Sequence, residues 1–368
     1  MRKIPLLKPF MPKGIITKLK ETIYSGWIGE GSKVKNLEKK LAKYLGCKYV
    51  VCTNSGTSAL WIACKLIDLK KGDIIISTPM TCSATNIPFL HFGAKIVWAD
   101  IDLKTGNISP ESIKKKINRK TKALCIVDYG GKPCEMDKIR SLARKYKIKV
   151  IEDAAQALGA RYKSIKLGNH NEYVCFSLQS VKTITSVDGG FLCLKSKKDY
   201  NRAKKLRWFG IDREKKLKKV DNWIYDIKDA GYKMHMNDVL ATIGIEQLNH
   251  IDKIINKQRA NAKYYNEKLK NMKEIITMED FKHYFNTYWL YILLVRDRKK
   301  FMNILKKRGI DVSPIHQRND KLSIFGKLDK RLKNLKYFDE HSVCMPNGYW
   351  VSKRDREYIV KVIKENFE

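Results

Sequence analysis

Short apolar runs separated by helix-like stretches constrain this sequence more than any other feature. Runs with the composition of β-strands occupy residues 48–53, 73–77, 95–99, 123–127, 149–152, 173–178 and 190–194. Between them, apolar residues recur at helical spacing, for example over 33–45, where the pattern ends at Gly46, and over 137–146. Buried strands that alternate with helices predict an α/β fold with a mainly parallel sheet.

The alternation stops in the last third of the chain. From about Val239 the spacing predicts one long helix to about Lys270, followed by a smaller α+β region that reaches Glu368. We therefore expect a large domain over 1–250 and a small domain over 251–368. No apolar run approaches the roughly 18 residues of a membrane helix, and the N-terminus lacks the apolar segment of a signal peptide. These features predict a cytoplasmic protein with no membrane partner.

The charge balance is strongly basic, with 75 Lys and Arg against 38 Asp and Glu and a net charge of +37. Such a balance raises nucleic acid as a partner. The lysines are spread along the chain, however, and base recognition favours arginine over lysine. We expect a solvated basic surface and no nucleic-acid partner, and the same field would favour a phosphate-bearing small substrate.

The nine cysteines show no zinc-type spacing, and many stand inside apolar runs. They are typical of reduced, mostly buried thiols in a cytosolic protein, and they predict no metal site.

Two segments place polar groups where a parallel sheet binds ligands. Residues 54–60 (NSGTSAL) lie between a strand and a helix, a geometry that points backbone N–H groups and hydroxyls at an anion. A plain helix N-cap is the alternative. Asp153, in EDAAQA, follows a buried strand directly, at the sheet edge where ligands bind, although it could instead cap a following helix.

Two further segments contain unusual side chains. Lys182 ends the run 176–182 (FSLQSVK), between an apolar strand and a Gly-Gly turn. Burial there would lower the pKa of the amine and make it a nucleophile, although most lysines in so basic a chain are surface charges. Trp27 stands among glycines in 25–31 (SGWIGEG), where a ligand could meet both backbone and indole, or where the chain simply turns.

Taken together, these segments resemble the DegT/DnrJ/EryC1/StrS family of pyridoxal-phosphate (PLP) sugar aminotransferases. The resemblance spans nearly the whole chain, through residues 25–46, 54–60, 152–160, 176–190 and 231–248 in the family's order. It implies the PLP-transferase fold type I, as in aspartate aminotransferase. That fold has a mixed, mostly parallel seven-stranded sheet and a smaller C-terminal α+β domain. The resemblance also implies a homodimer with shared active sites.

The resemblance assigns roles residue by residue. Lys182 matches the lysine that bonds to PLP and later moves a proton. Asp153 matches the carboxylate that pairs with the pyridine nitrogen, and Gln156 matches the residue near the ring hydroxyl. The donors around the PLP phosphate are matched by Gly56, Thr57, Ser58 and Ser177.

The sequence also departs from the family pattern. Cys82 stands where family members usually place an aromatic residue over the PLP ring, and losing that stacking would cost about 1 kcal/mol. The segment 231–236 (GYKMHM) matches one that reaches into the neighbouring subunit's site, with the contacting side chain left open. A lysine rather than a histidine at position 182 favours amine transfer over dehydration.

The implied reaction moves the amino group of L-glutamate to a keto group of a nucleotide-linked 4-keto-6-deoxyhexose, at C4 rather than C3. The product would be an amino-dideoxy sugar for glycan biosynthesis. Alternatives are a non-nucleotide keto substrate, a dehydratase, or a basic regulatory or nucleic-acid-binding protein on the same fold. Residues expected near the acceptor are Trp27, Tyr129, Lys132 and His316, with Arg207 and Arg213 as looser candidates for anionic groups, and each could instead be structural.

Overall fold

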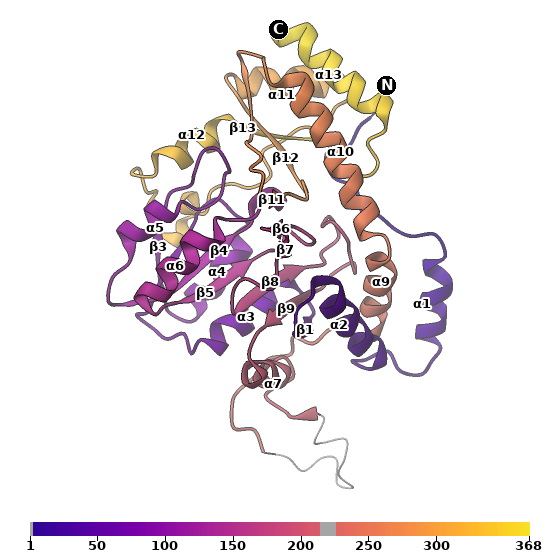
Figure 1. Ribbon diagram of the computed structural model, residues 1–368. Coiled ribbons are helices and arrows are strands. Elements are labelled where there is room, and N and C mark those ends of the chain that lie inside the picture. The colour runs from indigo at the N-terminus through magenta and orange to yellow at the C-terminus, as the bar shows by residue number, and fades with distance from the viewer. Residues whose placement is uncertain (1–2, 214–225) are drawn as a thin grey trace.

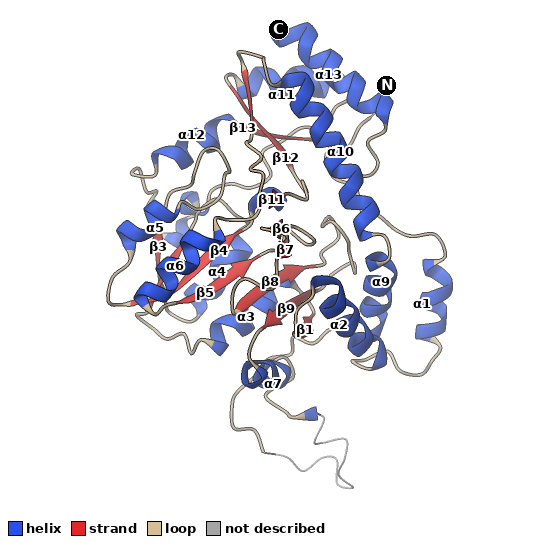
Figure 2. Ribbon diagram, in the orientation of Figure 1, coloured by secondary structure: helices blue, strands red, loops and turns tan. Residues whose placement is uncertain are grey.

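The computed structural model describes residues 3–213 and 226–368. Its centre is a seven-stranded sheet in the order β1-β9-β8-β5-β4-β2-β3, in which β9 alone runs antiparallel to its neighbours (Figures 1 and 2). This confirms the mixed, mostly parallel sheet. The strands are β1 (Tyr49–Thr53), β2 (Ile74–Ser77), β3 (Lys95–Trp98), β4 (Thr121–Val127), β5 (Lys149–Asp153), β8 (Tyr173–Ser177) and β9 (Gly190–Leu194).

Helices cover both faces of this sheet, and each face has its own apolar core. One core includes side chains from α2, α5, α6 and α9, and the other includes side chains from α3, α4 and α7. Short α1 packs outside α9. The bounds are α1 (Ile15–Ile23), α2 (Ser32–Leu45), α3 (Gly56–Leu66), α4 (Ser83–His91), α5 (Pro110–Lys116), α6 (Met136–Tyr146), α7 (Lys197–Leu206) and α9 (Asp238–Leu248).

The C-terminal part is built on a three-stranded antiparallel sheet with its own core. The N-terminus returns to it, because Ile4 pairs with Ile310, and both chain ends lie beside α13 in Figure 1. Its elements are α10 (Ile251–Leu269), β10 (Ile275–Thr277), β12 (Tyr291–Val295), α11 (Arg298–Lys307), α12 (Lys333–His341), β13 (Ser342–Met345) and α13 (Lys353–Phe367). A small third sheet joins β6 (Arg161–Tyr162), β7 (Ile165–Lys166) and β11 (Tyr284–Phe285), and short 3-10 turns are η1 (Tyr129–Gly131), η2 (Asn319–Lys321) and η3 (Ser323–Phe325).

The prediction of one long helix from about Val239 to Lys270 is wrong. The chain turns between α9 and α10, where the N–H of His250 donates to the carbonyl of Gln247 at 3.0 Å. α9 packs against α1 and α2, whereas α10 packs against α13, so the two helices belong to different packing arrangements. The domain boundary that we propose at residue 250 lies on this turn, although the first turns of α10 still pack in the core of the large part.

A fourth apolar cluster joins the two parts of the chain. It brings Trp98 and Tyr129 from the large part against Trp289 and Phe338 from the C-terminal part. In the large part, this cluster lies at the carboxyl ends of β3 and β4, because Trp98 ends β3 and Tyr129 closely follows β4. The indole N–H of Trp289 reaches across and donates to the carbonyl of Val181 at 2.7 Å.

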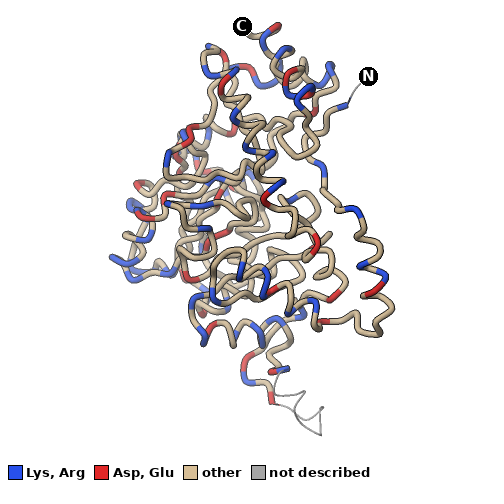
Figure 3. The backbone as a smooth tube through the Cα atoms, turned by 45° about the vertical axis from the view of Figure 1, so that its right-hand side comes forward, with Lys and Arg blue, Asp and Glu red and all other residues tan. Residues whose placement is uncertain are grey.

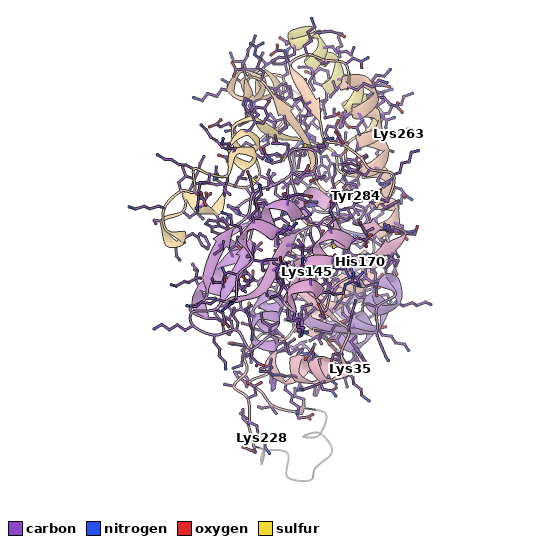
Figure 4. The ribbon with its side chains drawn as sticks, turned by 60° about the vertical axis from the view of Figure 1, so that its left-hand side comes forward. Lys35, Lys145, His170, Lys228, Lys263 and Tyr284 are labelled. Carbon is purple, nitrogen blue, oxygen red and sulfur yellow. The ribbon has the colours of Figure 1, made fainter. Side chains whose placement is uncertain are left out.

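The basic residues are dispersed, as the sequence predicts. Figure 3 shows Lys and Arg along the whole tube, and in Figure 4 the labelled Lys35, Lys145, Lys228 and Lys263 project from widely separated places. All nine cysteines are free thiols, and eight are buried; Cys82 is the exposed one. Over residues 3–213 and 226–368, we find no helix that combines the length and the apolar character needed to cross a membrane.

Candidate active site

Glycine lets the start of α3 approach the central sheet closely. A Cβ on Gly56 would lie 2.9 Å from the Cβ of Ser177 and 3.3 Å from the carbonyl oxygen of Phe176. A Cβ on Gly190, at the start of β9, would lie 2.4 Å from the Gly56 nitrogen. Side chains at these positions would push the helix away from the carboxyl edge of the sheet.

The N-terminus of α3 combines a cap with unused donors. Ser55 is the N-cap, and its hydroxyl accepts the N–H of Ser58 at 3.0 Å. The N–H groups of Gly56 and Thr57 are among those that a helix leaves without an intrahelical partner, and they suit an anion. Nearby, the Ser177 hydroxyl accepts only the N–H of Gln179, at 3.2 Å, so its own proton can be donated. The cap and the anion site therefore coexist in one turn.

Asp153 ends β5 and is 5% exposed. One carboxylate oxygen accepts the Thr85 hydroxyl at 2.6 Å, and the other accepts the N–H of Ala155 at 3.0 Å. Burial raises the pKa of this carboxyl, against the lowering effect of these bonds and of Lys182. No helix follows β5 before β6, so the helix-capping alternative is wrong.

Lys182 lies near Asp153 and against Trp289 of the C-terminal part. Its ammonium is 4.0 Å from the centre of the Trp289 ring. Burial lowers its pKa to about 8, opposed by the attraction of Asp153. Its amine forms no direct hydrogen bond or salt bridge within the described ranges. Lys182 is half-buried as a residue, and an amine with a lowered pKa and no acceptor is prepared for reaction with a carbonyl carbon.

The C-terminal part contributes His316 to the same place. Its Nε2 lies 3.4 Å from Nε2 of Gln156, and its ring meets the Tyr129 ring edge-on at 6.0 Å between centroids. Burial and the nearby Lys182 lower the pKa of His316 to about 4, so its imidazole is neutral at neutral pH. The Gln156 carbonyl is held by the N–H of Gly130 at 2.8 Å. The structure thus brings Tyr129, Gln156 and His316 together, and Lys182 and Asp153 lie close to them.

Lys132 and Trp27 lie elsewhere in this chain. Lys132 is buried, with its amine bonded to the Glu279 carbonyl; burial lowers its pKa to about 8, and Asp280 and Glu279 oppose that shift. Trp27 is 53% exposed and borders a groove of about 1070 Å³ between α2 and α7. None of the residues gathered around Lys182 lines that groove.

Arg207 and Arg213 are already paired with carboxylates. Arg207 is buried between Glu30 and Glu38, at 2.7 Å and 2.5 Å, and also donates to the Cys52 carbonyl at 2.8 Å. Burial would lower the pKa of its guanidinium, but the two glutamates raise it. Arg213 lies 3.1 Å from Glu30. Both arginines therefore hold Glu30 in place, and with it the segment 25–31 that contains Trp27.

The sequence did not reveal Thr85 and Trp289, which contact Asp153 and Lys182. Thr85, which bonds to Asp153, lies one turn beyond Cys82 on α4, and only the family-like segment 81–86 hinted at it. No sequence pattern pointed to Trp289, because it is far from Lys182 along the chain and meets it only in the folded protein. Cys82 caps the start of α4 with its thiol exposed, close enough to Lys182 for an electrostatic effect.

Comparison with known proteins agrees with this geometry. The model of the DegT/DnrJ/EryC1/StrS aminotransferase family matches residues 10–364. The chain belongs to this family. It is similar to the UDP-4-amino-4,6-dideoxy-N-acetyl-beta-L-altrosamine transaminase of Campylobacter jejuni, with 30% identity over 93% of this chain and 90% of the relative. It is also similar to the GDP-perosamine synthase of Escherichia coli O157:H7, with 29% identity over 86% and 85%.

Solved structures give the same result. The sugar aminotransferase CalS13 from Micromonospora echinospora superposes with a TM-score of 0.94 at 30% identity, covering 99% of this chain and 100% of that one. The fold is therefore fold type I. The chain is an aminotransferase whose cofactor is PLP. The residues of the site fit that cofactor. Within the described residues, Lys182 offers an amine without a hydrogen-bond acceptor, and Asp153 offers a buried carboxylate. The first N–H groups of α3, which Gly56 brings close to the sheet, suit its phosphate.

Proposed function

We propose that this aminotransferase moves the amino group of L-glutamate to the keto group of a nucleotide-linked 4-keto-6-deoxyhexose, with C4 favoured over C3. The relatives named above act on or make UDP- and GDP-linked sugars, and one of them is named for a 4-amino-4,6-dideoxy sugar. The observation that supports amine transfer is the Lys182 amine, whose pKa burial lowers, which is attracted by Asp153 and which has no hydrogen-bond acceptor among residues 3–213 and 226–368.

Each part of the site would hold one part of the cofactor. The phosphate would be bound by the amides of Gly56 and Thr57 and by the hydroxyls of Ser177 and Ser58, because donors at a helix start stabilise a dianion. The Ser58 hydroxyl donates to Oδ1 of Asn54 at 2.6 Å in this structure, so it would have to turn to reach the phosphate. Asp153 would hold a proton on the pyridine nitrogen, and Thr85 would keep its carboxylate in place. Gln156 would lie near the ring hydroxyl, and Cys82 would contact the ring from α4.

The protein's own contribution to the chemistry is the control of one amine and one proton. When bound, PLP supplies an electron-withdrawing ring that carries the amino group from donor to acceptor. Lys182 would bond to it covalently, be released when a substrate amine takes its place, and then take up and return the proton at the substrate carbon. Neutral His316 would approach the acceptor sugar without adding a charge beside Lys182.

We further propose that two copies of the chain complete each site. Large apolar side chains on α1 and the segment after it are exposed in the single chain: Ile16, Ile23, Tyr24, Trp27 and Ile28. Exposed apolar surface of this kind marks an interface. Within 231–236, only Lys233 is exposed, so it would make the contact with the neighbouring site that the family resemblance implies.

The acceptor can be identified with ¹⁵N-labelled L-glutamate and a panel of keto sugars. The proposal predicts ¹⁵N in the product of a UDP-, GDP- or dTDP-linked 4-keto-6-deoxyhexose, and none with a 3-keto isomer or with the free sugar. Labelling only of the free keto compound would favour the non-nucleotide alternative. Loss of water without ¹⁵N transfer would favour a dehydratase.

A further inference from the structure

Two carboxyl groups lie side by side beneath the active site, on the face of the sheet away from Lys182. The register pairs Ile126 with Glu152, and Asp128 follows two residues later at the end of β4. Because side chains alternate along a strand, Glu152 points away from the face of Asp153. Asp128 and Glu152 are both fully buried and their side chains interact directly.

Each carboxyl group has one oxygen with a donor and one without. Oδ1 of Asp128 accepts the N–H of Cys134 at 2.8 Å, and Oε2 of Glu152 accepts the amide of Asn171 at 2.5 Å. Oδ2 of Asp128 and Oε1 of Glu152 are buried and have no hydrogen-bond donor. Two adjacent carboxylates with lone pairs facing each other would repel, whereas one proton between them satisfies both atoms.

We propose that Asp128 and Glu152 share one proton, and that this hydrogen-bonded pair positions the turn and strand end that shape the active site. The backbone N–H of Asp128 donates to the carbonyl of Asp153 at 3.1 Å, and the carboxyl group of Asp128 holds the N–H of Cys134 at the far end of the turn, so Asp128 joins this turn to β5. The turn η1 begins at the next residue, Tyr129. Its Gly130 N–H holds the Gln156 carbonyl.

Burial is the main effect that retains the proton. It raises the pKa of both carboxyl groups, and Glu152 raises the pKa of Asp128 further. Cys134 faces the pair as a thiol whose own pKa burial raises, whereas Asn171 and the cations Arg140 and Lys195 lower the pKa of Glu152 and so oppose the effect of burial. Unfolded carboxyls lose their protons near pH 4. The stability that the pair contributes is therefore complete below that pH and is lost as the pH rises through the pair's raised pKa.

Infrared spectroscopy of the cofactor-free protein at neutral pH tests the shared proton directly. We expect a C=O band of a protonated carboxylic acid that is lost in both Asp128→Asn and Glu152→Gln. Asp238→Asn is the matched control and should keep the band, since Asp238 is a buried carboxylate that accepts three backbone N–H groups. If neither variant changes this band, the pair is ionised and the inference is wrong. This readout does not depend on the proposed function.

Positioning is tested by comparing a conservative and a disruptive change. Asn at position 128 can still accept from Cys134 and donate to Glu152, so PLP affinity should stay within about threefold of the parent. Asp128→Leu should weaken PLP binding by about tenfold, which is about 1.4 kcal/mol. Equal weakening by Asn and Leu would contradict the positioning role. If the Leu variant does not fold, the Asp128→Asn/Glu152→Gln double variant decides, because its unfolding free energy should fall less steeply with rising pH than the parent's, the remaining fall coming from other carboxyls with raised pKa values, such as Asp153.

Discussion

Arg207 and Lys182 are two cations away from the protein surface, and their surroundings differ: Arg207 is paired with carboxylates, whereas Lys182 lies against an aromatic ring. Arg207 lies between two glutamates and a carbonyl, and those glutamates raise its pKa. Lys182 has no acceptor in the described part of the chain, and burial lowers its pKa to about 8. Removing one partner of a buried ion pair is costly to the native structure, whereas a cation that has no hydrogen-bond acceptor is available to a ligand.

The largest expected effect comes from removing the unpartnered amine. Lys182→Ala should lower the rate of amine transfer about 10⁴-fold, because it removes both the amine that would bond to PLP and the group that would move the proton at the substrate carbon. Its unfolding free energy should change little. Lys166→Ala is the matched control, since Lys166 also has a pKa lowered by burial and lies over an aromatic ring, that of Tyr44 at 3.5 Å. Similar rates for the two variants would contradict the role of Lys182.

The paired charge should show the reverse behaviour. Arg207→Met should lower the unfolding free energy by about 3–5 kcal/mol, since it leaves the buried Glu38 without a cation and leaves Glu30 with Arg213 alone. The folded fraction should keep its catalytic rate. Urea unfolding and steady-state kinetics together measure both effects. An unchanged stability with a raised KM for the sugar nucleotide would instead place Arg207 at the substrate.

The pH dependence should separate the two sites further. The rate at which the cofactor-free protein captures PLP should rise about tenfold per pH unit and level off above about pH 8, the pKa of Lys182. An unfolded lysine has a pKa near 10.4, so the cost of burying this charged amine falls as the pH rises from 8 to 10. Stopped-flow absorption checks the first statement. A rate that still climbs steeply above pH 9 would show an ordinary surface amine.

The smallest expected effect concerns the exposed thiol on α4. Cys82→Phe should tighten PLP binding about fivefold, because ring stacking is worth about 1 kcal/mol. Cys82→Ser should leave the affinity within about twofold. Equilibrium titration of PLP absorption compares the three proteins. Weaker binding by the Phe variant would show that this position does not face the ring.

Local sequence patterns predicted the strands and singled out Asp153 and Lys182. Apolar runs bounded by turns specify buried strands, so the expected 149–152 differs from β5 by one residue. Contacts between distant segments had no such signal. Thr85 and Asp153 are 68 residues apart, and Val181 and Trp289 are 108 apart. The turn between α9 and α10 also stayed hidden, because helical spacing continues through it and only tertiary packing separates the two helices.

Chemical trapping of the cofactor shows which amine binds PLP. The protein would be incubated with PLP, reduced with borohydride, digested, and mapped by mass spectrometry, with and without prior addition of L-glutamate. We expect the label on the peptide that contains Lys182, and we expect it to disappear after L-glutamate, since the amino donor releases the lysine. A label scattered over other lysines, or one on Lys182 that L-glutamate does not remove, would contradict this role for Lys182.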